Sequence, residues 1–193
     1  MDINFVSFPR SGSHFIKYVF QDYLGGYLDD SVISSYIAHD HDIYLQKKYV
    51  DTLYVYRNKL DVVYSWYMAE NFNEVENFIK EDILNYYGLV SEHQNYYKYN
   101  SKLIYDYESL TQGINENWIN IFNFFGITDP DANKLESVLS NATKTNYVTR
   151  SLSQNNPYNV YDIQNKYMNE FMLSQKYKDM RIEFHEIFGY LCA

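Results

Sequence analysis

The first 25 residues predict a strand, a tight turn and a helix in direct succession, and this order constrains the fold more than any other feature. Residues 3–8 (INFVSF) form a short apolar run that is typical of a buried strand. Pro9 ends the run, and apolar residues then recur at helical spacing until the pair Gly25-Gly26. A strand that leads through a turn into a helix is typical of a parallel α/β sheet.

The rest of the chain continues this alternation. The sequence predicts further strands over residues 34–38, 52–56 and 102–107 and helices over 59–70, 74–99 and 108–125. Asp129 followed by Pro130 is typical of the start of another helix, and residues 151–159 resemble a linker. A chain of 193 residues suits one domain, so we expect a single domain over residues 1–193, with a mostly parallel sheet covered by helices on both faces.

Charge and composition exclude several classes of protein. The chain carries 16 Lys+Arg against 25 Asp+Glu, a net charge of −9, which argues against a nucleic-acid partner. The single cysteine excludes an internal disulfide or a cysteine metal cluster, and we expect no metal. No signal peptide or membrane span is recognisable, so we expect a cytoplasmic protein. The sequence carries no indication of oligomeric state.

Polar clusters follow three of the predicted strands. They are residues 9–14 (PRSGSH), 39–41 (HDH) and 57–58 (RN). In parallel sheets, ligands bind outside the carboxyl ends of the strands. The three clusters therefore predict one site at this edge of the sheet.

The first cluster has the chemistry of an anion-binding turn. The backbone N–H groups at the start of a helix point outward, and the helix dipole favours negative charge there. Gly12 lets a phosphate approach, Ser13 adds a hydroxyl and Arg10 adds full charge. The alternative is an ordinary helix cap with a solvated arginine. The pattern G-x-x-x-x-G-K-[ST] of nucleoside-triphosphate loops is absent, which argues against a kinase.

The third cluster adds a second contact for an anion. Arg57 closes a strand, and Ser65 follows eight residues later in the next helix. An arginine and a serine presented together suit one phosphate, with a bidentate contact from the guanidinium. The alternative is a structural salt bridge between Arg57 and Asp61.

These motifs resemble those of one enzyme family, the sulfotransferases. Residues 7–15 (SFPRSGSHF) resemble the family's 5′-phosphosulfate loop, and residues 53–65 (LYVYRNKLDVVYS) resemble its 3′-phosphate motif. Residues 104–110 (IYDYESL) are similar to the family's strand that ends in Tyr-Glu-Asp-Leu, and residues 188–190 (FGY) resemble its closing helix. The resemblance is strong over residues 3–67 and continues weakly to the end.

The resemblance implies a P-loop-like three-layer α/β/α fold and sulfuryl transfer from 3′-phosphoadenosine 5′-phosphosulfate (PAPS), without a metal. Arg10 would hold the phosphosulfate and stabilise the leaving oxygen. Phe15 would pack on adenine, although it also fits a core position of the first helix. Tyr107 would be a further contact with adenine. The resemblance implies two further groups of cofactor contacts by matched position. The 5′-phosphosulfate would be bound by Ser11, Gly12, Ser13 and His14, and the 3′-phosphate by Arg57 and Ser65.

The second cluster supplies the predicted catalytic base. The family often ends this strand with Lys-Thr/Ser-His, and the matching residues here are Ile37-Ala38-His39, so the histidine is present and the lysine is not. His39 is the predicted base, with His41 as the alternative and Asp40 or Asp42 to orient the ring.

Two departures keep other functions open, and the first is the missing lysine before His39. The late Arg-Lys-Gly-x-x-Gly segment of the family has no clean match, since residues 150–155 (RSLSQN), which begin with Arg150, lack both glycines. The alternatives are a relative that binds adenosine bisphosphates without catalysis and a P-loop-type nucleotide kinase. The acceptor is expected to be a small molecule or a glycan, with a hydroxyl or amine.

Overall fold

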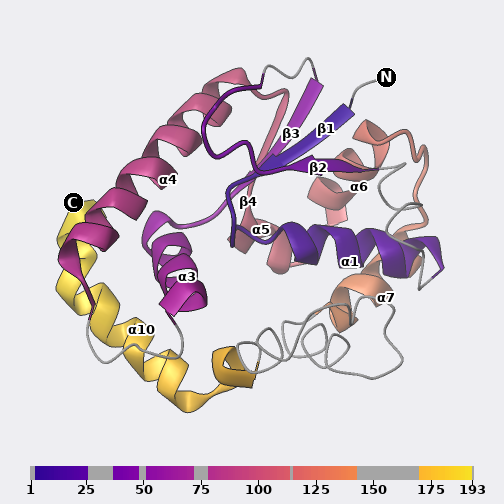
Figure 1. The fold of residues 1–193 in the computed structure, drawn as a ribbon. Coiled ribbons are helices and arrows are strands. Elements are labelled where there is room, and N and C mark those ends of the chain that lie inside the picture. The colour runs from indigo at the N-terminus through magenta and orange to yellow at the C-terminus, as the bar shows by residue number, and fades with distance from the viewer. Residues whose placement is uncertain are drawn as a thin grey trace. The chain divides into compact units, whose positions relative to one another are not determined.

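The computed structural model describes residues 3–25, 37–47, 51–71, 78–113, 115–142 and 170–192 (Figure 1). The chain forms two compact units. The first contains residues 1–57 and 92–144, and the second contains residues 58–91 and 145–193. The expectation of one domain over residues 1–193 stays a prediction.

The first unit is built on a parallel sheet of four strands. These are β1 (Ile3–Ser7), β2 (Ala38–Asp40), β3 (Asp51–Tyr56) and β4 (Leu103–Asp106), in the order β2-β1-β3-β4. Phe5 is paired with His39 on one side and with Leu53 on the other. Because every pairing is parallel, all carboxyl ends lie at one edge of the sheet. This all-parallel sheet with its helices confirms the predicted α/β fold class.

Helix α1 (Ser13–Leu24) packs through aromatic side chains against α6 (Asn115–Phe124). Phe20 stacks on Phe122 with ring centroids 4.3 Å apart, and Phe15 meets Trp118 edge-on at 5.8 Å. Gly25 ends α1 with φ of 120°, as the sequence predicted. Helices α5 (Tyr107–Thr111) and α7 (Ala132–Asn141) complete the described helices that lie wholly in this unit.

Helix α4 (Lys80–Asn100) belongs to both units, because its last nine residues lie in the first. There, Tyr97 packs on Val6 and Tyr54 of the sheet. Tyr97 is thus a buried packing residue of α4 on the sheet.

The described elements of the second unit are helical. Besides the first part of α4, they are α3 (Lys59–Asn71), α10 (Gln175–Phe188) and the 3₁₀ helix η1 (Gly189–Cys192). Tyr64 of α3 contacts Phe184 and donates a hydrogen bond to the carbonyl of Tyr177, at 2.6 Å. Val62 and Val63 of α3 are fully buried.

Three predicted elements differ from the structure. His39 and Asp40 belong to strand β2 itself rather than to a turn after it. The helix expected over residues 108–125 is two helices, because Gly113 adopts a φ of 73° between them. The residue that caps α7 is Asp131, whose carboxylate accepts hydrogen bonds from the amides of Asn133 and Lys134, and not Asp129.

No described helix combines the length and apolar character that a membrane span requires. The linker expected over residues 151–159 lies outside the described residues.

Candidate active site at the carboxyl edge of the sheet

The turn after β1 has the backbone of an anion-binding loop. Arg10 and Gly12 both adopt positive φ, 68° and 96°, and the amide of Ser11 closes the turn on the carbonyl of Phe8 at 3.1 Å. A non-glycine residue in this region is strained, and such strain gathers at functional sites. Helix α1 begins at Ser13, so its first amides point out of the turn.

Ser11 and Ser13 supply hydroxyl groups inside this turn. Ser11 is fully buried, and within the described part of the chain its Oγ has no hydrogen-bond partner. Ser13 is 5% exposed. An unpaired buried hydroxyl costs about 1–3 kcal/mol, which a bound anion would recover by accepting its proton. The turn therefore fits a phosphate or sulfate group.

The closest neighbour of Gly12 is the ring of Tyr107, at the start of α5. A Cβ atom on Gly12 would lie 2.2 Å from Cδ2 of Tyr107. The sequence had explained this glycine by the approach of a phosphate, and the structure adds the approach of an aromatic ring. Phe15 is 7% exposed and lies between Tyr107, at 5.5 Å, and Trp118. Phe15 thus occupies a core position.

We predict that Gly12→Ala destabilises the protein by about 2–4 kcal/mol. A left-handed backbone costs an alanine about 1–2 kcal/mol, and the ring of Tyr107 must also move. Gly113→Ala is the matched control, since Gly113 has φ of 73° with nothing within 4 Å of its Cβ position, and it should lose the backbone part alone. Urea unfolding measures both. Equal losses would contradict a close packing of Tyr107 on Gly12.

Two histidine rings stand beside the turn. His39 lies in β2 against Phe5, with its Nε2 3.1 Å from Oγ of Ser7. His41 lies edge-on to His39 at 4.5 Å and donates from Nδ1 to the carbonyl of Ser7 at 2.7 Å. The structure therefore brings the predicted base and its alternative together with the turn after β1.

A third histidine, His93, completes this cluster from α4. It is fully buried, donates from Nε2 to the carbonyl of His41 at 2.8 Å, and accepts at Nδ1 from the hydroxyl of Tyr54 at 3.0 Å. Its ring meets Phe8 edge-on at 5.1 Å. Sequence reasoning missed His93, because a lone histidine in a Tyr- and Asn-rich helix gives no signal of its neighbours.

The environment keeps these rings neutral. Burial is the largest cause, and it lowers the pKa of His93 to about 4. Burial, with His41 and Lys17, lowers the pKa of His39 to about 2, and burial also lowers the pKa of His41. His14 is exposed at the start of α1, and partial desolvation, then Lys17 and Arg10, lowers its pKa. Lys17 and Arg10 disfavour a positive charge on nearby histidines, and the same two cations would attract an anion.

The two aspartates near these rings mainly shape the loop. The carboxylate of Asp42 is buried and accepts hydrogen bonds from the amides of Gln46 and Lys47 and from the hydroxyl of Tyr97. Asp40 accepts from the amide of Asp42 and pairs with Lys47. Asp40 also raises the pKa of His39 and His41, so it stabilises their charged forms.

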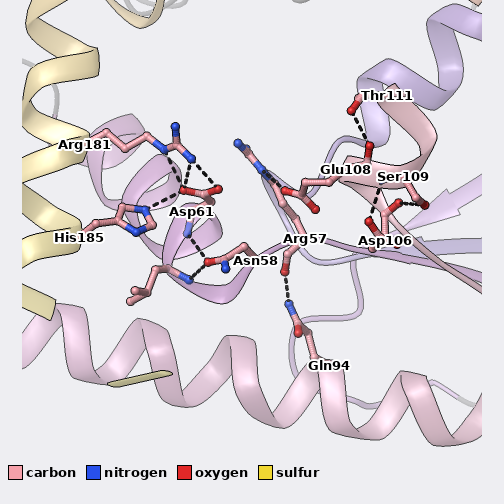
Figure 2. A network of polar contacts seen from close by, with 11 residues as sticks. Arg57, Asn58, Asp61, Gln94, Asp106, Glu108, Ser109, Thr111, Arg181 and His185 are labelled. Carbon is pink, nitrogen blue, oxygen red and sulfur yellow. Dashed lines mark hydrogen bonds and ion pairs between the residues drawn. The ribbon is translucent and has the colours of Figure 1, made fainter. Parts of the chain in front are cut away.

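Arg57 follows β3 at the same edge. Its carbonyl accepts a hydrogen bond from Nε2 of Gln94 at 2.7 Å, which fixes the main chain. Its Nε lies 3.4 Å from Oε1 of Glu108 (Figure 2). Its guanidinium lies 5.2 Å from the ring centre of Tyr107. Tyr107 thus lies against Gly12 of the first cluster and Arg57 of the third cluster.

Asp61 and Ser65 lie in α3, within the second unit. The carboxylate of Asp61 is bound by Nε and Nη2 of Arg181, both at 2.8 Å, and by Nε2 of His185 at 2.8 Å (Figure 2). Ser65 is 7% exposed. Asp61 thus links α10 to α3. For Arg57, the structure shows an ion pair with Glu108. The pairing of Ser65 with Arg57 stays a prediction, and Arg150 lies outside the described residues.

In the described residues, no three metal-ligating side chains of His, Cys, Asp or Glu come together as a metal site.

Comparisons with known proteins agree with this geometry at the level of the fold. No family model and no curated sequence matches the chain. Among solved structures, mouse sulfotransferase SULT7A1 complexed with PAP matches with a TM-score of 0.58 and 16% sequence identity. The match covers 95% of this chain and 82% of that one. The chain therefore has the fold of the sulfotransferases.

Proposed function

We propose that this protein binds PAPS and transfers its sulfuryl group to a hydroxyl or amine acceptor. One observation carries the proposal: the turn after β1, with the buried hydroxyl of Ser11, and Arg57 after β3 lie at the carboxyl ends of adjacent strands. Two separate anion contacts at one sheet edge suit a nucleotide with phosphates on both its 5′ and 3′ oxygens. The sulfotransferase fold supports the same conclusion.

Each predicted contact has a role in this proposal. The amides at the start of α1 bind the 5′-phosphosulfate, together with the side chains of Arg10, Ser11, Ser13 and His14. Arg57 and Ser65 bind the 3′-phosphate. Tyr107 contacts adenine, and its place against Gly12 and Arg57 supports that role. The burial of Phe15 favours an indirect role, in which its ring supports Tyr107.

The reaction needs a base and a stabilised leaving group. A histidine of the β2 edge, His39 in the prediction from sequence, takes the proton of the acceptor. The acceptor atom forms a bond to sulfur while the bond from sulfur to the bridging oxygen breaks, and that oxygen leaves with adenosine 3′,5′-bisphosphate. Arg10, Ser13 and the start of α1 stabilise its negative charge. Sulfuryl transfer resembles phosphoryl transfer, in which positioning and electrostatics supply most of the catalysis.

The proposal is tested by ligand-dependent stability. We expect adenosine 3′,5′-bisphosphate at 100 times its Kd to stabilise the protein by about 2.7 kcal/mol, which raises Tm by about 5–10 °C. ATP and GTP with Mg²⁺ should raise Tm much less, because neither carries a 3′-phosphate. A larger shift with ATP and Mg²⁺ would favour the kinase alternative. Binding of the bisphosphate without transfer of labelled sulfate would favour the non-catalytic relative.

A further inference from the structure

The two adjacent rings at the β2 edge differ in which nitrogen is free to accept a proton. A neutral imidazole has one N–H and one lone pair, so the hydrogen bonds of each ring decide whether it can act as a base. The bonds made by His39 and His41 assign these positions.

His39 has no free lone pair in this arrangement. Ser7 is fully buried, and within the described residues the hydrogen-bond partner of its hydroxyl is Nε2 of His39, at 3.1 Å. The hydroxyl proton needs an acceptor, because an unsatisfied buried donor costs about 1–3 kcal/mol. The hydroxyl therefore donates to Nε2, and the proton of the neutral ring sits on Nδ1. The only lone pair of His39 faces a buried side chain.

His41 has the opposite arrangement. Its Nδ1 lies 2.7 Å from the carbonyl oxygen of Ser7, which can only accept, so Nδ1 carries the proton. The lone pair is then on Nε2, which makes no hydrogen bond within the described part of the chain. The side chain is partly exposed at the edge of the sheet. Burial lowers the pKa of both rings, so both are neutral at pH 7.

The main chain of His41 is also held in place. His93 donates to its carbonyl at 2.8 Å, and the hydroxyl of Tyr54 orients His93 at 3.0 Å. His93 and Tyr54 are both fully buried. The ring and the backbone of His41 thus have separate anchors, which suits a side chain that must aim one nitrogen at a substrate.

We propose that Nε2 of His41 accepts the proton of the acceptor, and that His39 is a positioning residue beside it. The proposal rests on the proposed function. The proton leaves the acceptor oxygen or nitrogen for Nε2, and the freed electron pair forms the bond to sulfur. The bridging oxygen departs with adenosine 3′,5′-bisphosphate, and the resulting imidazolium keeps its Nδ1–H on the carbonyl of Ser7.

Chemical modification tests the assignment without any acceptor. Diethyl pyrocarbonate acylates an accessible, unprotonated imidazole nitrogen, and fragment ions in mass spectrometry distinguish His39 from His41 within one peptide. At pH 7 we expect His41 to react at least about tenfold faster than His39, because the lone pair of His39 faces buried Ser7. Equal or faster reaction of His39 would overturn the assignment.

Matched variants then test the catalytic role. With PAPS as donor and 4-nitrophenol, 2-naphthol and N-acetylglucosamine as acceptors, we expect His41→Gln to lower kcat by about 10²–10⁴-fold. The Kd for the bisphosphate should stay within about twofold. His39→Gln should lower kcat less than about tenfold, and a larger loss than in His41→Gln would overturn the proposal. A wild-type chain that binds no bisphosphate overturns the proposed function, whereas the modification experiment still decides which lone pair is accessible.

Discussion

Replacing Arg57 by alanine should weaken binding of adenosine 3′,5′-bisphosphate about 100-fold, because the variant loses two charge-assisted hydrogen bonds to the 3′-phosphate. Adenosine 5′-monophosphate lacks that phosphate, so its Kd should change less than about threefold. Isothermal titration calorimetry measures both affinities. Arg57→Lys should give an intermediate loss, because lysine keeps the charge and lacks the planar fork.

Lys102→Ala is the matched control for this experiment. It removes the same charge, but Lys102 pairs with Asp51 at the amino ends of the strands. We expect its Kd for the bisphosphate to stay within about twofold of the wild type. If both variants lost affinity equally, the effect would be one of net charge, and the placement of the 3′ contact at Arg57 would be wrong.

Acidification should destabilise the fold well before most carboxylates are protonated. His93 is fully buried, and burial lowers its pKa from 6.5 to about 4. The unfolded state therefore binds more protons between these values, and stability is lost as the pH falls below 6.5. For His93 alone the loss is about 2 kcal/mol by pH 5 and about 3 kcal/mol by pH 4.

This effect is large against a total stability of about 5–15 kcal/mol, and His39 adds to it in the same direction. Urea unfolding at pH 7.5, 6.5, 5.5 and 5 measures the fall. His93→Gln cannot gain the proton, so its free energy of unfolding should start lower at pH 7.5 and decline less steeply. Parallel curves for the two proteins would show that another group causes the pH dependence.

Local sequence patterns were sufficient where one element carries its own signal. The apolar run at residues 3–8 and the pair at Gly25-Gly26 predicted β1 and α1 almost to the residue. The turn predicted at His39 and Asp40 was wrong, because strand β2 has only three residues, two of them polar, and residues 34–36 of the predicted strand lie outside the described residues. Strand β2 is held as a strand by pairing with β1, and such pairing is a long-range contact that composition does not reveal.

The candidate site was predictable only in part for the same reason. Parallel strands bring their carboxyl ends together, so the turn after β1, the β2 histidines and Arg57 could be placed at one edge from the sequence alone. The hydrogen bond from His93 to His41 and the ion pair of Arg57 with Glu108 could not be predicted from the sequence. Both depend on how α4 and α5 pack, and neither residue lies in a pattern that predicts a partner.

During synthesis, Asp61 is made well before Arg181, the residue that it pairs with. The two residues are 120 positions apart, and at about 5–20 residues per second the ribosome needs roughly 6–24 s to pass from one to the other. Until Arg181 emerges, the Asp61 carboxylate has no guanidinium to offset its burial and stays hydrated. The second unit thus reaches its native packing only after α10 has been synthesised. Until then, the face of α3 that carries Asp61 stays exposed to solvent.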